Sequence, residues 1–395
     1  MTVRRFADLN PPPRLLFGTG PTNPDPRVLR ALGLPLLGQF DPAFTAIMNE
    51  VADLCRFVFR TGNAQAFPVS GTSRAGLEAG LCSLIEPGDR VVVGVAGRFG
   101  ELLAEISSRC GADVVPVPVE WGRVIEPEAL RDALRRGRPK VVALVHGDTS
   151  TGVLQPLPEL VRLAHDHGAV VLVDAVLTLG GVAVETDLWR LDVCVGGTQK
   201  CIGCPSGMAP ITYTPQVDRL IASRRRPAQS NYLDLAQIQA YWGPARLNHH
   251  TLPTSLTYGL REALRLVYEE GLEARWERHR RAGAALHAGL GAMGLSLFGD
   301  PAHRLPMLAI VNVPEGISEP GIREALLSRH NIEIMAAFGP LRGRAWRIGF
   351  MAYNAETRNV LNFLEAFEEV LRDSGLRLPS RAGVEAAARA TDAGA

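Results

Sequence analysis

Short apolar runs alternate along the middle of the chain with stretches in which apolar residues recur every three or four positions. The runs occupy residues 90–95, 114–119, 141–145, 169–173 and 193–195. Between them, residues 126–135 and 157–167 have helical spacing, with a proline in the first turn of each, where a missing N–H does no harm. Because the runs are continuously apolar, they predict strands buried on both faces of a mostly parallel sheet that helices cover.

The pattern changes near Leu256. One or two long amphipathic helices are predicted over residues 256–290, with a break at Gly271. Strand-like pieces and a helix follow, at residues 308–313, 332–335, 346–350 and 356–372. This pattern predicts a smaller α+β domain. We therefore expect an N-terminal arm (1–20), a large domain (21–255), a small C-terminal domain (256–373) and a tail (374–395) that is either a surface helix or frayed.

The composition excludes several classes of protein. The chain has 395 residues, of which 46% are hydrophobic and 21% charged, as is typical of globular proteins. Its net charge of +1 offers no basic field for nucleic acid, and no apolar run of about 18 residues indicates a transmembrane helix. The first residues lack an apolar core of signal-peptide length, and six cysteines are too sparse for a disulfide scaffold. We therefore expect a cytoplasmic protein with no nucleic-acid or membrane partner.

Lysine is almost absent from this chain. Of its 42 basic residues, only Lys140 and Lys200 are lysines. Lys140 lies in a polar stretch before an apolar run and is expected to be a surface charge. Lys200 ends the segment GGTQK, just after a predicted strand. Because arginine keeps its proton and lysine can lose it, Lys200 is a candidate for chemistry that needs a neutral amine.

Other polar side chains follow predicted strands, at the sheet edge where ligands collect in such folds. Thr72, Ser73 and Arg74 begin a predicted helix and are suited to bind a phosphate, with an ordinary helix cap as the alternative. Asp174 ends an apolar run, where it is either a functional carboxylate or a capping residue. The loop HGDTSTG supplies the hydroxyl of Thr149.

Together these residues meet the needs of one cofactor, pyridoxal 5'-phosphate. Its aldehyde requires a lysine amine, its ring nitrogen a carboxylate, its phosphate a helix N-terminus and its phenolic oxygen a hydroxyl partner. A substrate carboxylate would further require an arginine fork. Arg347, in the apolar segment WRIGFM, is the candidate for that role.

From about Leu16 to Arg372 the chain resembles the fold-type I, class V aminotransferases of the alanine–glyoxylate and serine–glyoxylate group. The resemblance rests on the order of the motifs SGTSRAG, GRFG, HGDTSTG, LVDAV, GGTQK, HHT and WRIG. It implies an α/β architecture in which a large domain with a mostly parallel seven-stranded sheet is joined to a smaller C-terminal α+β domain. It also implies a homodimer with shared active sites that takes a small amino donor and glyoxylate.

The resemblance implies a role for each motif residue. Lys200 would be the Schiff-base lysine that also carries the proton, and Asp174 would pair with the ring nitrogen. Phe99 of GRFG would stack on the ring, and Thr149 would lie beside the phenolic oxygen. Thr72, Ser73, Arg74 and Gln199 would bind the phosphate. Thr251 would reach the same phosphate from the partner subunit. Arg347 would anchor the substrate carboxylate.

A closer resemblance is to the ureidoglycine–glyoxylate aminotransferases of purine catabolism, carried by GQFDPAF, PSGMAPITY, SNYLDL and RLNHHT. In that group the positions of Gln39 and Asn248 are held to bind the ureido group of the substrate, which presents donors and an acceptor as carboxamides do. The implied activity converts (S)-ureidoglycine and glyoxylate to glycine and N-carbamoyl-2-amino-2-iminoacetate. With both residues as ordinary loop amides, alanine– or serine–glyoxylate transamination is the alternative.

Three further interpretations of the motifs are weaker. Cys201 and Cys204 have the spacing of a zinc or redox motif, but no second pair accompanies them, so we expect packing residues and no metal. A lyase or desulfurase of the same fold would require a mobile cysteine, and these two lie too close to Lys200 in sequence. A Rossmann-like nucleotide binder would require a GxGxxG motif directly after the first strand, and none follows it there.

Overall fold

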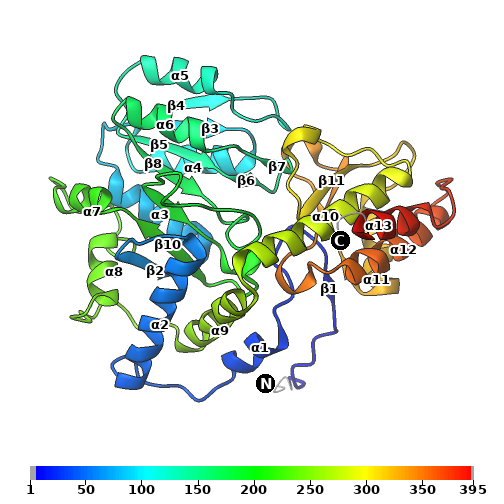
Figure 1. Cartoon of the computed structure of the whole chain (residues 1–395), viewed down its shortest axis with the longest axis horizontal. Helices are drawn as coiled ribbons and strands as arrows, with labels where there is room; N and C mark the ends of the chain where they lie inside the picture. Colours follow the sequence, from blue (N-terminus) through cyan, green and yellow to red (C-terminus); the bar gives the residue numbers. More distant parts are fainter. Residues whose placement is uncertain (1–5, 393–395) are drawn as a thin grey trace, which may run out of the picture.

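A seven-stranded sheet forms the centre of the larger part of the computed structural model, which describes residues 6–392 (Figure 1). Its strand order is β2-β10-β9-β8-β5-β3-β4. In that order the strands are β2 (Gln65–Ser70), β10 (Met208–Tyr213), β9 (Val193–Val195), β8 (Val170–Asp174), β5 (Val141–Val145), β3 (Arg90–Val95) and β4 (Asp113–Pro118). Only β10 runs antiparallel to its neighbours. The predicted mostly parallel seven-stranded sheet is therefore confirmed.

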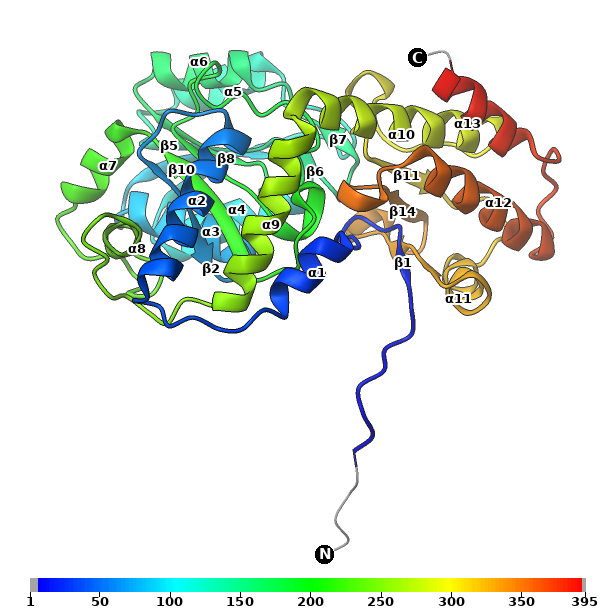
Figure 2. The same ribbon diagram turned by 60° about the horizontal axis from the view of Figure 1, so that its bottom comes forward.

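The central strands are buried because helices lie on both faces of the sheet (Figures 1 and 2). Every residue of β8 is buried, and residues 141–144 of β5 have no exposed surface. The surrounding helices are α1 (Pro26–Leu32), α2 (Pro42–Phe59), α3 (Ser73–Leu84), α4 (Arg98–Arg109), α5 (Pro127–Arg135), α6 (Pro158–Asp166), α7 (Pro215–Ala222), α8 (Leu235–Trp242) and α9 (Thr254–Glu270). The continuous apolar runs reflect this burial on two faces.

The smaller part of the molecule is an α+β domain, as the sequence predicts. Its antiparallel sheet has the order β11-β14-β13. The elements are β11 (Leu308–Asn312), β13 (Met335–Ala336), β14 (Ala345–Gly349), α10 (Leu272–Ala292), α11 (Glu319–His330), α12 (Thr357–Asp373) and α13 (Ala382–Asp392). Two small pairings complete the fold: β1 (Leu15–Leu16) with β12 (Ile332–Glu333), and β6 (Gly147–Asp148) with β7 (Val153–Leu154).

Of the three hydrophobic cores among the described residues, the two largest divide near the junction of α9 and α10. Residues of α9 as far as Val267, together with Leu272, pack in the larger core, beyond residue 255 where the sequence places the boundary. The smaller core begins with Phe17 of the N-terminal segment and continues from Ala282. Gly271, with φ of 81°, separates the two helices and confirms the predicted break. The sequence places the boundary too early because the amphipathic pattern of a helix shows which face is buried but not which of two cores that face packs against.

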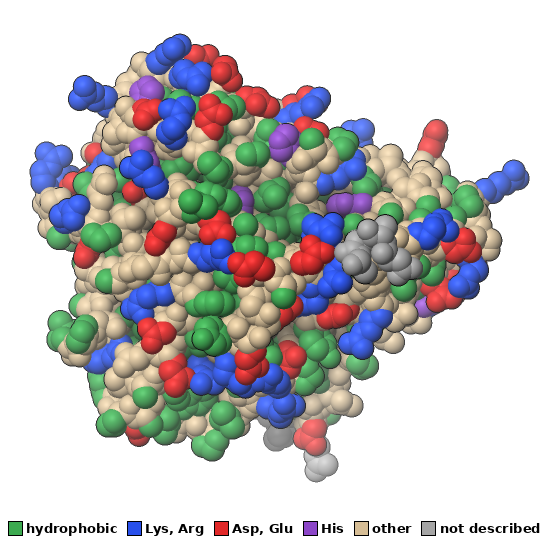
Figure 3. All heavy atoms as spheres, in the orientation of Figure 1, with side chains coloured by type: hydrophobic (Ala, Val, Ile, Leu, Met, Phe, Trp, Pro, Cys, Tyr) green, Lys and Arg blue, Asp and Glu red, His purple; other side chains and the backbone are tan. Residues whose placement is uncertain are grey.

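Residues 382–392 of the tail form the helix α13, which packs on α10 and buries Ala387 completely, so the surface-helix alternative is found there; residues 393–395 lie outside the described residues. Charged side chains of both signs are interspersed on the face drawn in Figure 3. Among residues 6–392, no helix has both the length and the apolar composition needed to cross a membrane.

Candidate active site

A cavity of about 370 Å³ opens at the carboxyl ends of β5 and β8, beside the N-termini of α3 and α4. It brings together most of the residues to which the sequence assigns the cofactor. Those that line it are Thr72, Ser73, Arg74, Phe99, Thr149, Asp174, Gln199 and Lys200. They are contributed by segments spread over almost 130 residues, so the fold, not sequence proximity, assembles this constellation.

Lys200 lies on a π-helical turn, Thr198–Ile202, which follows β9. Its backbone is not helical, with φ of −109° and ψ of −129°, and its Nζ donates a hydrogen bond to the carbonyl oxygen of Thr19. Burial lowers the pKa of Lys200 to about 8, and the nearby charge of Arg347 adds to this effect. The other lysine, Lys140, forms an ion pair of 2.6 Å with Asp89 far from the cavity lining. Lys200 is therefore the lysine that can present a neutral amine to a ligand.

Asp174 is the last residue of β8 and is only 4% exposed. One carboxylate oxygen, Oδ1, accepts a hydrogen bond of 2.9 Å from the backbone N–H of Val176. Burial raises the pKa of Asp174 to about 7 despite that bond. A protonated ring nitrogen in the cavity would offset the cost of burying this charge, so the residue fits the pyridine nitrogen of pyridoxal phosphate.

The N-terminus of α3 forms one end of the cavity. Thr72 is the N-cap residue, but its side chain makes no capping hydrogen bond, which speaks against the ordinary-cap alternative. The hydroxyl of Ser73 donates to Gln199 Oε1 at 3.0 Å, and this joins the helix start to the turn that carries Lys200. Hydroxyls, backbone N–H groups and Arg74 at a helix N-terminus fit a phosphate group.

The HGDTSTG loop holds both Thr149 and the start of α4, which carries Phe99. Asp148, buried in this loop, accepts hydrogen bonds from the backbone N–H of Ser150 at 2.8 Å and of Phe99 at 3.3 Å. Ser150 Oγ accepts another, from the backbone N–H of Arg98 at 3.0 Å. The cap residue of α4 is Gly97, where a Cβ would lie 2.6 Å from Asp148 Oδ2. Side chains of this loop thus accept hydrogen bonds from the first backbone N–H groups of α4, and this fixes the position of Phe99 relative to Thr149.

Arg347 lies on β14, 4% exposed, and reaches the same loop from the small domain. Its Nε donates to the carbonyl oxygen of Ala336 at 2.7 Å and its Nη1 to that of Thr149 at 3.3 Å. The guanidinium stacks on the ring of Phe338, 3.9 Å from the centroid. Burial lowers the pKa of Arg347 to about 10. Arg347 does not line the cavity itself, but its charge acts on Lys200.

Three predicted residues lie away from the cavity of their own chain: Gln39, Asn248 and Thr251. Gln39 and Asn248 nevertheless contact each other, although they are 209 residues apart in the sequence. Gln39 Nε2 donates a hydrogen bond to Asn248 Oδ1 at 3.1 Å. The Oε1 atom of Gln39 is buried and has no hydrogen-bond partner. Asn248 and Thr251 are exposed.

The cysteines beside Lys200 behave as packing residues. Cys201 and Cys204 are 0% and 2% exposed, and burial raises the pKa of both thiols to about 12. Both thiols therefore stay protonated at neutral pH, the form that suits packing rather than metal binding.

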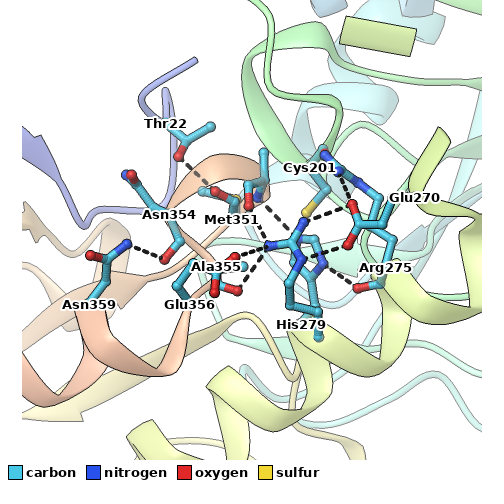
Figure 4. Close-up of polar contacts among 12 residues, drawn as sticks. Thr22, Cys201, Glu270, Arg275, His279, Met351, Asn354, Ala355, Glu356 and Asn359 are labelled. Carbon is cyan, nitrogen blue, oxygen red and sulfur yellow. Dashed lines mark hydrogen bonds and ion pairs between the residues drawn. The ribbon is translucent and has the colours of Figure 1, made fainter. Parts of the chain in front are cut away.

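Sequence reasoning missed the contacts that hold the turn of Lys200 from behind. Thr22 donates from its backbone N–H to the carbonyl oxygen of Gln199 at 3.2 Å. The buried side chain of Arg275 donates to the carbonyl oxygen of Cys201 at 2.6 Å (Figure 4). Neither residue lies in a recognisable motif, and Arg275 is one arginine among many, so the sequence carries no signal for them.

Comparison with known proteins places these residues in context. Residues 28–357 match the family described as Aminotransferase class-V. The chain is 47% identical to the (S)-ureidoglycine–glyoxylate transaminase of Bacillus subtilis over 98% of this chain and 95% of that protein. It is 39% identical to the alanine–glyoxylate aminotransferase of Callithrix jacchus, over 92% and 89% of the two chains. The crystal structure of ureidoglycine–glyoxylate aminotransferase from Bacillus subtilis superposes with a TM-score of 0.96 at 48% identity, over 98% and 100% of the chains.

Proposed function

The chain belongs to the class V aminotransferase family, and on that premise we propose that it transfers the amino group of (S)-ureidoglycine to glyoxylate in purine catabolism. The observation that carries this choice of donor is the amide pair of Gln39 and Asn248. The pair leaves one buried acceptor, Gln39 Oε1, without a partner. The N–H groups of a ureido substrate would satisfy that acceptor, whereas the methyl group of alanine would leave it unpaired.

The cofactor of this family is pyridoxal 5'-phosphate, and the cavity fits it. When bound, it supplies an aldehyde that condenses with primary amines and a ring that withdraws electrons from the donor carbon. In this chain, Lys200 would hold the aldehyde, Asp174 the ring nitrogen, and the start of α3 the phosphate. Phe99 would pack on the ring face, and Thr149 would bind the phenolic oxygen.

Lys200 is suited to move the proton that amino transfer requires. With its pKa at about 8, part of this amine is neutral near neutral pH, far more than for an ordinary lysine, so it can accept a proton from the donor carbon and return it on the same face. Asp174, as a buried carboxylate, would keep the ring nitrogen protonated. Arg347 would bind the carboxylate of the amino donor and of glyoxylate in turn.

The balance of atoms fixes the second product. The amino group leaves the donor carbon as the amine of glycine, and the aldehyde oxygen of glyoxylate replaces it. The donor therefore becomes the 2-oxo acid that keeps the ureido group. The N-carbamoyl-2-amino-2-iminoacetate expected from the sequence retains a nitrogen that the transfer must remove, so it is not the product.

A second copy of the chain would complete the site. Thr251 does not line the cavity of its own chain. In the segment that carries Gln39, the side chains of Leu34, Leu36 and Phe40 are 54%, 70% and 59% exposed. Apolar surface of this kind favours a contact between protomers. We propose a homodimer in which Thr251 reaches the phosphate site of the partner subunit, and Gln39 and Asn248 act at a shared site. The six unbridged, buried cysteines are in keeping with a cytoplasmic enzyme.

A donor titration tests the proposal. Purified enzyme in its cofactor-bound form is mixed with ureidoglycine generated in situ, L-alanine or L-serine, and loss and recovery of the cofactor absorbance on adding glyoxylate are followed. Ureidoglycine should act at the lowest concentration. Gln39→Leu should raise its KM at least about tenfold and leave that of alanine unchanged. Gln216→Leu, at an exposed position on α7, is the matched control.

Alanine is the second candidate donor, which the 39% identity to an alanine–glyoxylate aminotransferase favours. If alanine is the better donor and Gln39→Leu does not change the preference, the ureido assignment is wrong while the transaminase assignment stands.

A further inference from the structure

The first turns of α10 form a polar junction between the two domains (Figure 4). Arg275, Arg278 and His279 are spaced three and four residues apart, so their side chains share one face of the helix. Arg275 and His279 are buried, at 5% and 0% exposed. Glu270, at the end of α9, lies between the two arginines. Three charged groups are therefore concentrated where a helix passes from one hydrophobic core to the other.

Arg275 holds the turn that carries Lys200. Its Nη1 donates to Glu270 Oε2 at 2.7 Å. Its Nη2 donates to the carbonyl oxygen of Cys201 at 2.6 Å and, more weakly, to that of Ile202 at 3.4 Å. These are the two residues that follow Lys200. The planar guanidinium thus joins the distorted turn to the end of α9 with a geometry that a single ammonium cannot reproduce.

The other two side chains hold a turn of the small domain. Arg278 Nη1 donates to the carbonyl oxygens of Ala352 at 2.8 Å and Ala355 at 2.9 Å, and Arg278 Nε donates to Glu270 Oε1 at 2.6 Å. Burial lowers the pKa of His279 to about 3, so its ring is neutral. Its Nε2 can therefore accept the backbone N–H of Ala352, at 3.0 Å.

The turn so held follows the strand of Arg347. Ala352 has a positive φ of 50°, which is unfavourable for a residue with a Cβ and persists only where the surroundings impose it. It lies a few residues after β14, on which Arg347 lies. The two turns also touch directly, because a Cβ on Gly203 would lie 2.8 Å from the Cβ of Ala352.

A second, independent link joins the same two turns. The Oγ1 of Thr22 donates to the carbonyl oxygen of Met351 at 2.9 Å, and the backbone N–H of Thr22 donates to that of Gln199. The chain therefore ties the turn of Lys200 to the turn after Arg347 from two sides. The buried charges are notable, since an apolar side chain of similar volume would fill this position without the desolvation cost of a guanidinium.

We propose that Arg275, joined to Arg278 through Glu270, is a positioning residue that sets the place of the Lys200 amine relative to the carboxylate anchor Arg347. Arg275 does not line the cavity and acts through the carbonyl of Cys201. The inference rests on the proposed function only in that Lys200 holds the cofactor, and it does not depend on which amino donor the enzyme prefers.

The test compares Arg275→Met, Arg275→Lys and the double variant Glu270→Gln/Arg275→Met with Arg280→Met. Arg280 is exposed on the same helix and pairs with Glu277, so it is a matched control. The double variant also neutralises Glu270, which in Arg275→Met alone would lose one of its two arginine partners and keep its charge beside Arg278. Each protein, with cofactor bound, is measured for its melting temperature, its kcat and KM, and the pH midpoint of the cofactor absorbance.

We expect the double variant to melt close to the wild type, while its kcat falls at least about tenfold with little change in KM, because a small displacement of the amine slows proton transfer. The pH midpoint of the cofactor absorbance should shift by about one pH unit, because a displaced Lys200 nitrogen lies at a different distance from the buried charges of Asp174 and Arg347. The charged groups facing Lys200, Asp174 and Arg347, are unchanged in every variant. Arg275→Lys should restore the melting temperature to near the wild-type value, but its pH midpoint of the cofactor absorbance should remain shifted.

A double variant that is folded and keeps the wild-type kcat and absorbance midpoint would overturn the proposal. So would an Arg280→Met protein that changes as much as the Arg275 variants do. Failure of the proposed function looks different, because the wild-type enzyme would then lack the lysine-bound cofactor absorbance or prefer another donor.

Discussion

Asp174 makes the stability of the cofactor-free protein depend on pH, and Asp174→Asn should remove that dependence. Burial raises the pKa of this carboxyl from 3.8 to about 7. Between about pH 4 and pH 7, the folded protein keeps a proton that the unfolded chain has already released. Because the unfolded state binds fewer protons over this range, the free energy of unfolding falls as the pH rises.

The magnitude follows from the size of the pKa shift. A shift of about three pKa units, at about 1.4 kcal/mol per unit, corresponds to about 4 kcal/mol at pH values above 7. Part of this loss is already present at pH 5, so about 3 kcal/mol should be lost between pH 5 and pH 8. The asparagine side chain is uncharged at every pH and carries no such penalty.

Urea unfolding of both cofactor-free proteins at several pH values between about 5 and 8 measures the effect. The stability of Asp174→Asn relative to the wild type should increase steadily with pH. Binding of pyridoxal phosphate should flatten the wild-type profile, because a protonated ring nitrogen beside the carboxylate offsets its burial. A stability difference that stays constant across this pH range would refute the reasoning.

Three further predictions concern other parts of the site. Gly97→Ala should weaken cofactor affinity at least about tenfold, because its Cβ would lie 2.6 Å from Asp148 Oδ2 and displace α4; an absorbance titration that shows unchanged affinity would contradict this. Arg347→Lys should raise the KM of both the amino donor and glyoxylate about tenfold or more, and a rise for only one substrate would argue against a shared anchor. Cys204→Ala should lower the free energy of unfolding by about 1 kcal/mol and leave kcat unchanged, and EDTA treatment should not affect activity; inactivation by EDTA would point to a metal.

Much of the large domain could be predicted because its strands are buried on both faces. The apolar runs at residues 90–95, 141–145 and 193–195 coincide with β3, β5 and β9. No run predicted β10, which contains Pro210 and pairs antiparallel with β2, where Pro210 faces Pro68. A strand at this antiparallel end of the sheet lacks the β-branched continuity that marks the parallel strands.

The cavity was predictable for a related reason. Parallel strands end at one edge of the sheet, so polar residues that follow separate apolar runs must converge there. That argument found Asp174, Thr149 and Lys200 without any knowledge of distances. It could not find Arg275 or Thr22, because their contacts with the turn of Lys200 are made to main-chain carbonyl groups, by a side chain in one case and by a backbone N–H in the other. Tertiary packing alone selects them.

The central claim, that Lys200 holds the cofactor, can be tested most directly by borohydride reduction of the cofactor-bound enzyme, followed by peptide mass spectrometry. The chain has only two lysines, so the result is unambiguous. The pyridoxyl adduct should be found on Lys200 and not on Lys140, and Lys140→Arg should retain full activity while Lys200→Arg loses it. An adduct on Lys140, or normal transamination by Lys200→Arg, would contradict the account.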